Sequence, residues 1–379
     1  MRLLFITQDF PPDVGGTQTY AYELSRRLAA RCDDFAVVAP QRPGDEAVDA
    51  TLPFEVVRVQ ASYNTLSVKA FTPVLRLAQQ RRFDTAFHVQ WPTAIATLLA
   101  RPFGGPRRIF VAAHGRELLL EPLAQVPLLK TFYNGLRNTV LRRVDGLFPV
   151  SRYTGHLLKA RGVSPGRIRV LNNGTDPARF YPADATALRE DLGLTDHKIL
   201  LTISRLVPRK GIDTVLRALP YILKAVPDAC YLIGGDGPDQ ERLTLLAQHL
   251  GVADHVRFLG RIPYDNLRLY YNVGDVFVMP SREDVPYVEG FGIVFLEANA
   301  CGKPVVGASS GGIPDAVQDG ETGLLVTPDD VAGLADALIR LLTDTQFAAT
   351  LGLNGRQQVL EEANWDRVAD RLYNWLAPS

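Results

Sequence analysis

The sequence predicts an α/β protein made of two Rossmann-like domains, and three observations support this fold class. The chain has 379 residues, which exceeds the ~250–300 residues that one hydrophobic core usually supports. Short apolar runs alternate with helical patterns along the whole chain, as expected of βαβ units with parallel sheets. A turn-rich stretch at residues 172–177 interrupts this alternation once. We therefore expect two domains in succession.

The expected strands form two sets, one on each side of the turn-rich stretch. In each strand, β-branched and other apolar residues dominate a short run. The first set lies at residues 3–7, 35–39, 54–59, 85–89, 108–112, 146–150 and 167–171, and the second at residues 198–204, 229–234, 256–260, 275–280, 304–307 and 323–326. The domain boundary is predicted near residues 172–185.

The end of the chain is predicted to leave the second domain. From residue 329 the pattern is helical, and one helical face carries Trp365, Val368, Leu372 and Trp375. We expect this last helix to pack back onto the first domain; packing on its own domain is the alternative. The first domain is thus predicted to comprise residues 1–175 with about 362–379, and the second domain residues 176–361.

Composition and charge exclude several classes of protein. The chain carries 41 basic and 41 acidic residues, so it has no net charge to attract nucleic acid. The N-terminal apolar run is too short for a signal peptide, and no window approaches the ~18 apolar residues of a membrane span. Cys32, Cys230 and Cys301 fit neither a disulfide framework nor a metal cluster. We expect a cytoplasmic protein with reduced thiols and no nucleic-acid partner.

Two glutamates mark the first candidate site, in the second domain. Residues 275–280 are predicted to form a buried strand and residues 292–298 a helix. Glu289 lies in the loop between them, and Glu297 lies on the helix. Because a carboxylate accepts hydrogen bonds from vicinal hydroxyls, one glutamate suits a sugar and the other a ribose. The alternative is that both are solvated surface charges.

The start of the same helix is a candidate anion site. Helix N-termini at the carboxyl edge of a parallel sheet present unpaired N–H groups to phosphates. The amides of Gly292, Ile293 and Val294 are therefore candidate donors to a diphosphate. The candidate ligand-binding residues of this segment are Glu289, Gly290, Phe291, Gly292, Ile293, Val294 and Glu297.

Two basic residues supply the second candidate element. Arg205 and Lys210 follow the strand at residues 198–204, at the carboxyl edge of the same predicted sheet. Preorganised cations stabilise the negative charge of a departing nucleoside diphosphate. Because these cations are present and no Asp-x-Asp motif occurs, we expect no catalytic metal and no other cofactor. The alternative is a solvated basic turn, of which Arg209 is the expected representative.

The first domain offers two weaker signals. Gly15 and Gly16 join the first strand to the first helix, where glycines let the backbone approach a ligand and can adopt positive φ. His114 follows the strand at residues 108–112 and is expected to project from its carboxyl end. An imidazole there can donate a hydrogen bond to a sugar hydroxyl or a phosphate. A tight turn and a lone histidine are the respective alternatives.

Taken together and in this order, these stretches resemble the retaining glycosyltransferases of family 4, and the resemblance covers essentially the whole chain. It implies the GT-B fold, in which two Rossmann-like domains with parallel sheets face each other across a cleft. Glu289 and Glu297 match the family's E-x7-E pair, which implies that Glu289 lies near the transferred sugar and Glu297 binds ribose. The resemblance also implies retention of the anomeric configuration.

Other roles are implied in the same way. Arg205 and Lys210 match the family's donor-phosphate clamp, Gly16 matches its glycine-loop contact, and His114 matches its histidine near the reaction centre. In similar enzymes the base lies in the second domain near the segment that corresponds to residues 256–261, which makes Arg261 a candidate.

The donor and the acceptor are less well defined. Residues 204–211 and 288–297 most closely resemble phosphatidylinositol mannosyltransferases, which implies GDP-mannose as donor; a UDP-sugar is the alternative. The loop at residues 281–287 departs from the family pattern and borders the expected sugar site. We expect the first domain to bind a glycan or lipid-linked acceptor through loops such as residues 9–19 and 61–68.

A membrane contact is also suggested. Residues 127–144 carry Lys130, Arg137, Arg142 and Arg143 and no acidic residue. The same stretch has an apolar stripe formed by Leu129, Phe132, Tyr133, Leu136, Val140 and Val144. A basic amphipathic helix can lie on an anionic membrane, here the cytoplasmic face. The alternative is a helix packed on the first domain.

Three rival functions remain open. A sugar-nucleotide epimerase of the same fold would bind a similar donor without transferring anything. A dinucleotide oxidoreductase is suggested by Gly235 and Gly237, but Gln240 stands where G-x-G-x-x-G requires glycine. A non-catalytic carbohydrate- or nucleotide-binding protein is the third.

Overall fold

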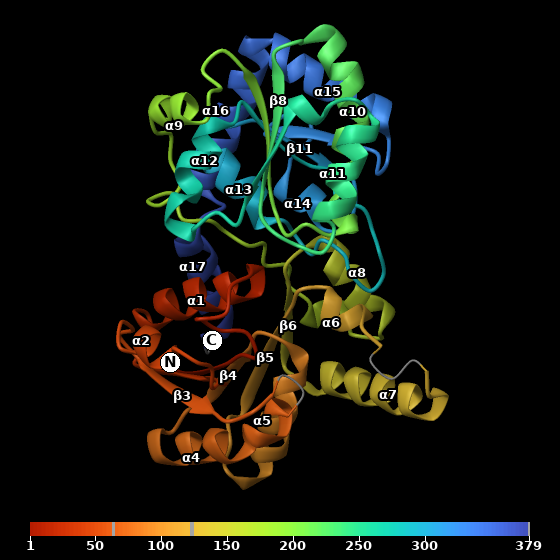
Figure 1. Cartoon of the computed structure of the whole chain (residues 1–379). Coiled ribbons are helices and arrows are strands. Elements are labelled where there is room, and N and C mark those ends of the chain that lie inside the picture. Colours follow the sequence, from red (N-terminus) through yellow and green to blue (C-terminus); the bar gives the residue numbers. More distant parts are fainter. Residues whose placement is uncertain (63–64, 122–124, 378–379) are drawn as a thin grey trace. The chain divides into compact units, whose positions relative to one another are not determined.

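A computed structural model describes residues 1–62, 65–121 and 125–377. The chain divides into two compact units. Unit 1 comprises Met1–Asn173 and Trp365–Ser379, and unit 2 comprises Gly174–Asn364. The divisions expected from the sequence were 175/176 and about 361/362. Each unit is an α/β structure with a parallel sheet, as predicted (Figure 1).

Unit 1 contains a six-stranded parallel sheet in the order β3-β2-β1-β4-β5-β6. Neighbouring strands are in register, with Leu3 opposite Phe35 on one side and Thr85 on the other. The strands are apolar because helices cover both faces of the sheet. They are β1 (Arg2–Ile6), β2 (Asp34–Pro40), β3 (Glu55–Val59), β4 (Thr85–His88), β5 (Arg108–Ala113) and β6 (Gly146–Pro149).

The helices of unit 1 connect these strands. Helix α8 shows how their ends are set, since the Ser151 hydroxyl caps it by accepting the N–H of Thr154. They are α1 (Gly16–Ala29), α2 (Asp45–Asp49), α3 (Leu66–Lys69), α4 (Phe71–Arg81), α5 (Ala94–Ala100), α6 (Arg116–Leu119), α7 (Pro127–Arg143) and α8 (Arg152–Ala160), with 3₁₀ turns η1 (Trp91–Thr93), η2 (Arg101–Phe103) and η3 (Pro165–Arg167).

The strand predicted at residues 167–171 was wrong. That segment begins in the turn η3 and makes one isolated bridge, between Leu147 and Ile168. Its backbone still bonds to β6, because Arg169 N–H donates to the carbonyl of Leu147 at 3.0 Å. Val170 is 36% exposed. The segment therefore lacks packing on its outer side, and it does not form a regular strand beside β6.

Unit 2 repeats the topology of unit 1. Its six parallel strands have the order β12-β11-β10-β7-β8-β9, which becomes 3-2-1-4-5-6 when they are counted from β7 and read in reverse. The strands are β7 (Lys198–Ile203), β8 (Ala229–Gly234), β9 (Val256–Gly260), β10 (Val276–Met279), β11 (Val305–Ala308) and β12 (Gly323–Val326).

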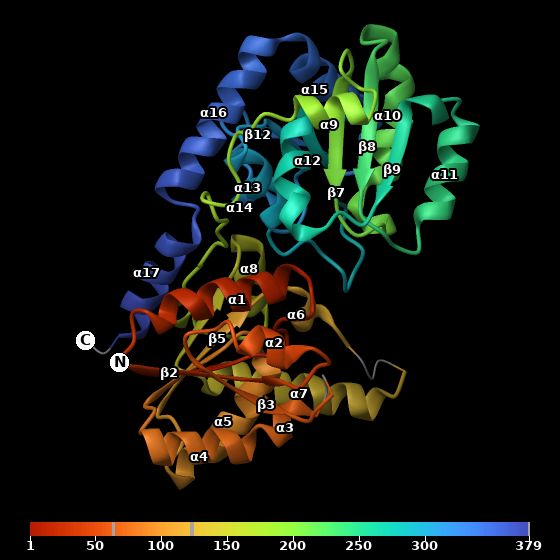
Figure 2. The same ribbon diagram turned by 60° about the vertical axis from the view of Figure 1, so that its left-hand side comes forward.

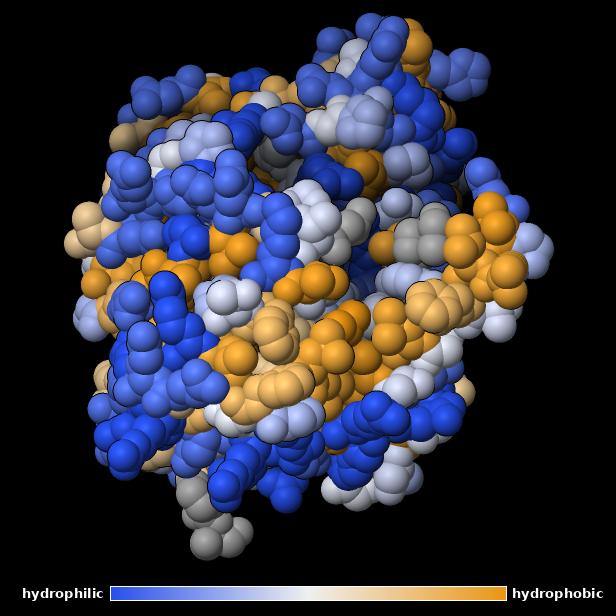
Figure 3. Space-filling view, turned by 90° about the horizontal axis from the view of Figure 1, so that it is seen from below, coloured by the Kyte–Doolittle hydropathy of each residue, from blue (hydrophilic) through white to orange (hydrophobic). Residues whose placement is uncertain are grey.

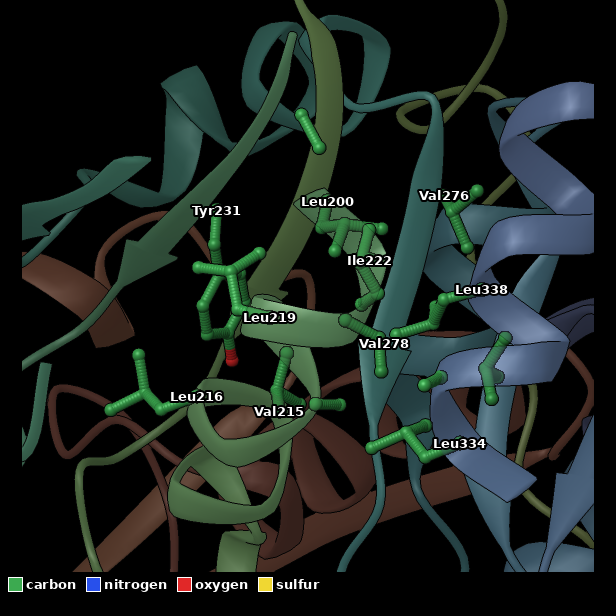
Figure 4. Close-up of a cluster of buried hydrophobic side chains, with 14 of the residues drawn as sticks. Leu200, Val215, Leu216, Leu219, Ile222, Tyr231, Val276, Val278, Leu334 and Leu338 are labelled. Atoms are coloured by element: carbon green, nitrogen blue, oxygen red, sulfur yellow. The ribbon is translucent and has the colours of Figure 1, made fainter. Parts of the chain in front are cut away.

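Helices also cover both faces of the sheet of unit 2 (Figure 2). They are α9 (Thr186–Asp191), α10 (Ile212–Ala225), α11 (Gln240–His249), α12 (Leu267–Val273), α13 (Ile293–Ala300), α14 (Ile313–Ala316), α15 (Val331–Thr343) and α16 (Thr345–Glu361), with 3₁₀ turns η4 (Pro208–Lys210), η5 (Ala253–His255) and η6 (Tyr264–Asn266). Helices α10 and α15 pack on one face, and Figure 4 shows Leu219 of α10 and Leu338 of α15 in that core. The Tyr231 hydroxyl in this core is paired with Thr202 Oγ1 at 2.7 Å.

The last helix, α17 (Trp365–Leu376), belongs to unit 1, so the predicted return of the chain is confirmed. Trp365 is buried, and its ring meets Tyr20 of α1 edge-on at 5.9 Å. Trp375 stacks on Phe148 of β6 at 5.6 Å. Ion pairs such as Arg31–Asp370, at 2.7 Å, flank this packing. An amphipathic helix from the end of the chain thus completes one face of unit 1.

Candidate functional site

The strand order of unit 2 places a topological switch point between β7 and β10. From β7 the chain proceeds outward to β8 and β9, whereas from β10 it proceeds the other way to β11 and β12. In open α/β sheets, ligands bind beyond the carboxyl ends of the strands at this point. The loops at residues 204–211 and 280–292 both leave the sheet there, and they carry six of the predicted residues: Arg205, Lys210, Glu289, Gly290, Phe291 and Gly292.

The loop after β7 is packed tightly against the end of β10. Gly211 has a left-handed φ of 72°, and a Cβ atom there would lie 2.1 Å from the carbonyl oxygen of Pro280. Only glycine fits this approach. The turn η4 therefore holds Lys210 beside the loop that follows β10, while Arg205 stays exposed at the start of the connection.

Lys210 and Glu289 form an ion pair at the switch point. Lys210 Nζ lies 2.5 Å from Glu289 Oε2, and Arg209 Nη1 lies 3.3 Å from the same oxygen. Burial alone would raise the pKa of Glu289, but the positive charges of Lys210 and Arg209 outweigh it, so this pKa is lowered. Burial lowers the pKa of Lys210, and nearby Arg209 and Arg205 add to this effect while Glu289 opposes it. The structure thus brings together a carboxylate and three cations.

Arg209 was misjudged from the sequence. It was expected to be a solvated turn residue, but it is half-buried and paired with Glu289. The reason is that η4 turns both Arg209 and Lys210 toward the β10 loop. Adjacency to Lys210 was the one available signal.

The loop that carries Glu289 is held from both sides. The Glu289 carbonyl accepts the N–H of Gly312 at 2.8 Å. Arg282 pairs with Asp213 and, at 3.0 Å, with Asp329. These contacts fix a segment that has little regular structure of its own, and they fix the Glu289 backbone with it.

The N-terminus of α13 follows directly. Gly292 caps the helix in a left-handed conformation, with φ 96°. An α-helix leaves its first N–H groups without intrahelical partners, so Ile293 and Val294 present their amides at this edge of the sheet. The Phe291 side chain is 3% exposed and packs into the core. Only its backbone is available to a ligand.

Glu297 is buried rather than solvated, with 7% exposure. The Tyr271 hydroxyl donates to its Oε2 at 2.6 Å. Burial raises the pKa of Glu297 to about 7, and the Tyr271 hydrogen bond and the charge of Arg179 oppose that rise. Sequence reasoning found Glu297 but missed Tyr271 and Arg179, which lie 26 and 118 positions earlier and have no motif to mark them.

Arg261 and the Gly235–Gly237 turn lie further along the same edge. Arg261 is exposed and follows β9, the outermost strand, so β8 separates it from the β7 loop. A Cβ atom on Gly235 would lie 1.9 Å from the carbonyl oxygen of Ser204. This glycine is therefore required by contact with the protein's own β7 loop, which removes the main support for a dinucleotide site.

Unit 1 has its own switch point, between β1 and β4. Asp9 follows β1 and Gln90 follows β4; the Gln90 amide donates to Asp9 Oδ2 at 2.7 Å. Gln18 of α1 donates to Oδ1 at 2.8 Å. Burial raises the pKa of Asp9, although the Gln90 hydrogen bond opposes it. The sequence placed Asp9 in a candidate loop but gave no indication of Gln90.

Gly15 and Gly16 lie at the start of α1, beside Asp9. Gly15 has an extended φ of 162°, and neither glycine is left-handed, so positive φ is not the reason for glycine here. A Cβ atom on Gly16 would meet nothing within 4 Å. The space above Gly16 is therefore open to a ligand.

His114 follows β5 and is half-buried against Tyr20, whose ring it meets edge-on at 4.7 Å. Burial lowers the pKa of His114 to about 4. The imidazole is thus neutral at pH 7, and within residues 1–62, 65–121 and 125–377 no group forms a hydrogen bond with its Nε2. The His114 N–H donates to Glu117 at 2.7 Å, which fixes the backbone. A buried polar atom without a partner is costly, so His114 is a candidate for a polar ligand contact.

Metal sites, membrane-spanning helices and thiols were considered over all the residues that the structure describes. Within residues 1–62, 65–121 and 125–377, no three His, Cys, Asp or Glu side chains are grouped to hold a metal ion. None of the helices described there is long and apolar enough to cross a bilayer. All three cysteines are free thiols. Part of the candidate acceptor loop, residues 63–64, lies outside the described residues.

Comparison with known families gives two matches that together cover most of the chain. Residues 14–179 match "Glycosyltransferase Family 4", and residues 184–358 match "Glycosyl transferases group 1". The first match corresponds to most of the strands and helices of unit 1, and the second to most of those of unit 2.

Individual proteins are similar over their full length. The GDP-mannose-dependent alpha-(1-6)-phosphatidylinositol monomannoside mannosyltransferase of Mycolicibacterium smegmatis is 37% identical over 99% of this chain and 98% of its own. The N-acetyl-alpha-D-glucosaminyl L-malate synthase of Bacillus anthracis is 29% identical over 95% and 93%. Among solved structures, sucrose-phosphate synthase from Thermosynechococcus elongatus is 26% identical, with a TM-score of 0.80 over 99% of each chain.

Proposed function

Because the chain belongs to the family 4 glycosyltransferases and has their GT-B fold, we propose that it is a retaining enzyme that transfers mannose from GDP-mannose. The proposed acceptor is a lipid-linked glycan or polyol, and a phosphatidylinositol mannoside is the first to test. The donor and the acceptor are supported by the name of the mycobacterial relative and its full-length identity. Retention is carried over from the family.

The observation that carries this proposal is the Lys210–Glu289 pair at the β7–β10 switch point. We assign the diphosphate to Arg205, Lys210 and the α13 amides, the sugar hydroxyls to Glu289 and the ribose to Glu297. A departing diphosphate gains negative charge, and buried cations stabilise that charge most strongly where water is excluded. In this proposal arginine and lysine do the work that a metal ion does elsewhere, and no cofactor is required.

His114 and the Gly15–Gly16 turn complete the proposal from unit 1. A neutral imidazole with a free Nε2 can donate to, or accept from, a hydroxyl or a phosphate oxygen. The open space above Gly16 suits a close backbone approach. We assign both to substrate contacts, and Arg261 to the nucleotide base.

UDP-sugar transfer is the alternative. It is supported by the similarity to the N-acetyl-alpha-D-glucosaminyl L-malate synthase and to sucrose-phosphate synthase, whose names carry sugars other than mannose. A sugar-nucleotide epimerase is less well supported, since the mycobacterial relative is named as a transferase. Nothing at Arg261 selects guanine over uracil.

A donor screen tests the proposal. Thermal unfolding is compared with GDP-mannose, UDP-glucose and UDP-N-acetylglucosamine; a ligand at 100 times its Kd stabilises the fold by roughly 2.7 kcal/mol. The selected donor is then incubated with and without phosphatidylinositol monomannoside. GDP-mannose should stabilise the protein and yield a dimannoside. Stabilisation by UDP-sugars alone would select the alternative, a changed nucleotide sugar without acceptor would indicate an epimerase, and no stabilisation by any of them would overturn the proposal.

We also propose that α7 contacts the cytoplasmic membrane surface, with a residue set that corrects the sequence analysis. Arg137 is buried, at 4% exposure, and donates to the Leu120 carbonyl, so it cannot face lipid. Val140 and Val144 are core residues, and Lys130 pairs with Glu121 at 2.7 Å. The exposed apolar side chains at the start of α7 are Val126, Leu128, Leu129 and Phe132.

These side chains are among the exposed apolar residues of unit 1. Figure 3 views the α4, α5 and α7 side of unit 1 and shows a band of apolar surface between hydrophilic regions. Exposed apolar side chains rimmed by charge are typical of a membrane surface site. Liposome binding with 30% anionic lipid should fall when Leu128 and Phe132 are both changed to Ser. Leu353→Ser changes an exposed apolar residue of unit 2 and should bind as the wild type does. Equal binding of all three proteins would refute the contact.

A further inference from the structure

The buried carboxylate of Glu297 is held by a group that no family motif marks. Tyr271, on α12, is fully buried and donates its hydroxyl to Glu297 Oε2 at 2.6 Å. The pKa of Tyr271 is raised well above its usual value by burial and by the nearby Glu297 charge, so its hydroxyl keeps its proton and remains a donor. Helix α12 and helix α13 are thus joined by one short hydrogen bond inside unit 2.

The ring of Tyr271 has no freedom to turn away. It meets Phe180 edge-on at 5.7 Å and Phe277 at 5.8 Å. Phe277 in turn meets Phe295 of α13 edge-on at 5.6 Å. An aromatic cluster therefore fixes the position of the hydroxyl, and the hydroxyl fixes one oxygen of the carboxylate.

The second oxygen of Glu297 is left for a ligand. Among the residues that the structure describes, no group donates a hydrogen bond to Oε1. A carboxylate with one oxygen anchored has a single orientation for the other. It then accepts from a ligand hydroxyl without first losing side-chain freedom.

We propose that Tyr271 is a positioning residue for the nucleotide ribose: it anchors Glu297 Oε2 so that Oε1 faces the vicinal ribose hydroxyls. The inference rests on the proposed function, in which Glu297 binds the ribose. The proposal adds Tyr271 to the E-x7-E pair. It also gives a reason for a carboxylate at Glu297, which is buried on α13.

The hydrogen bond also sets the charge of Glu297. Burial favours the neutral carboxyl, whereas Tyr271 and Arg179 favour the carboxylate. The other groups that act on Tyr271 are the Cys301 thiol, whose pKa burial raises to about 12, and the Tyr264 phenol. Arg179 is itself held by Asp265, at 2.5 Å, and by the Tyr264 ring, at 3.6 Å. Loss of the Tyr271 hydroxyl therefore makes Glu297 harder to ionise and leaves Arg179 as its one cationic neighbour among the described residues.

The test compares Tyr271→Phe with the wild type by calorimetric titration of GDP and 2′,3′-dideoxy-GDP. Phenylalanine keeps the ring contacts and removes the hydroxyl alone. Wild type should prefer GDP over the dideoxy ligand by on the order of 100-fold, as expected for hydrogen bonds to a charged group. In Tyr271→Phe this preference should fall to about tenfold, and in Glu297→Gln to a few-fold. UDP and 2′,3′-dideoxy-UDP replace this pair if the donor screen selects UDP.

Tyr231→Phe is the matched control. It removes another buried hydroxyl of unit 2, the one paired with Thr202, and should leave the ribose preference unchanged. Titrations from pH 6 to 9 add a readout that a purely structural role would not move. The affinity for GDP should weaken as pH falls through the pKa of Glu297. In Tyr271→Phe this weakening should begin at a higher pH than in the wild type.

The outcomes separate the inference from the proposed function. If wild type binds neither GDP nor UDP, the proposed function fails and the inference with it. If wild type prefers the ribose form and Glu297→Gln reduces the preference to a few-fold, but Tyr271→Phe matches wild type both in this preference and in the pH dependence of its affinity, the inference alone is overturned.

Discussion

The two units have the same strand order but different chemistry at the switch point. In unit 2 the loops after β7 and β10 bring together Arg205, Arg209, Lys210 and Glu289. In unit 1 the loops after β1 and β4 join Asp9 to Gln90 through an amide hydrogen bond, and His114 lies nearby in its neutral form. One edge gathers three cations around a carboxylate, whereas the other joins a carboxyl, an amide and an imidazole, with Arg42 and Arg116 acting on that carboxyl from nearby.

This difference teaches that the scaffold decides where a ligand binds and the loops decide which ligand. A Rossmann-like sheet offers the same crevice in both units. Cations beside a helix N-terminus suit a diphosphate, whereas amides, one carboxyl and an imidazole suit hydroxyl groups. The proposed division between donor and acceptor follows from that contrast, and each prediction below tests one side of it.

The largest effect is expected from Lys210→Ala in unit 2. Removal of this cation leaves Glu289 buried with one fewer partner and takes away the charge that stabilises the leaving diphosphate. We expect kcat/KM for transfer to fall on the order of 100- to 1000-fold. Steady-state kinetics with the selected donor measure it.

Lys224→Ala is the matched control for this loss. Lys224 is exposed on α10, away from the β7 loop, and contacts the Tyr221 ring. It should retain wild-type kinetics. A loss of less than tenfold in Lys210→Ala would show that the charged edge of unit 2 is not where the leaving group is stabilised.

The second effect is a split between binding and turnover in Glu289→Gln. The change removes the negative charge that pairs with Lys210 and Arg209, so both cations become freer to meet a diphosphate. We expect transfer to fall about 100-fold while GDP binds as tightly as to wild type or up to about tenfold more tightly. Steady-state kinetics measure the transfer rate and calorimetric titration measures the affinity for GDP, both on one preparation of the variant. Parallel loss of turnover and GDP affinity would contradict the assignment of Glu289 to the sugar.

Much of this contrast could be predicted from the sequence, because the decisive residues lie in short loops directly after strands. Arg205, Lys210 and Glu289 each stand within 11 positions of a strand end. Parallel strands bring their carboxyl ends to one edge, so sequence position implied spatial proximity. The packing of the last helix was also predictable, because a helical face that carries Trp365 and Trp375 is expected to be buried against another surface.

The remainder depends on contacts that have no local pattern. Tyr271 meets Glu297 because α12 and α13 pack together, and no spacing within α12 encodes that contact. Arg209 was misjudged because a turn residue in sequence is indistinguishable from a paired one until the β10 loop is placed. The strand expected at residues 167–171 has the right apolar composition but lies at the sheet edge, where packing on one side alone does not complete a ladder.

The third effect is acid sensitivity that differs between the units. Burial lowers the pKa of His88 to about 3 and of His114 to about 4, both in unit 1. Since these values lie below the unfolded pKa of about 6.5, the stability they contribute is present above pH 6.5 and is lost as pH falls. Between pH 7 and pH 5 each should cost unit 1 about 2 kcal/mol. In unit 2, Glu297 has a raised pKa and acts in the opposite sense, favouring the fold at low pH.

This contrast is measurable because Trp91, Trp365 and Trp375, the three tryptophans of the chain, all lie in unit 1. Urea unfolding followed by tryptophan fluorescence reports unit 1, and far-UV circular dichroism reports both units. From pH 7 to pH 5 the fluorescence midpoint should fall more than the circular dichroism midpoint. His114→Gln should recover about 2 kcal/mol of the loss. Identical shifts by both probes would show that the two edges do not differ in their protonation.

The smallest effect on stability is expected from Gly16→Ala, and it separates a glycine kept for a ligand from one kept for the fold. Gly16 is not left-handed and has nothing within 4 Å of an added Cβ, so alanine should leave unit 1 unchanged or stabilise it by up to about 1 kcal/mol. Transfer should nevertheless fall about tenfold, because the methyl group occupies space into which a substrate would come. Gly211→Ala in unit 2 should do the reverse and destabilise the fold, since its Cβ would lie 2.1 Å from the Pro280 oxygen. Thermal unfolding and transfer assays on both variants decide the matter: full activity in Gly16→Ala would mean that the open space above α1 is unused and that unit 1 binds its substrate elsewhere.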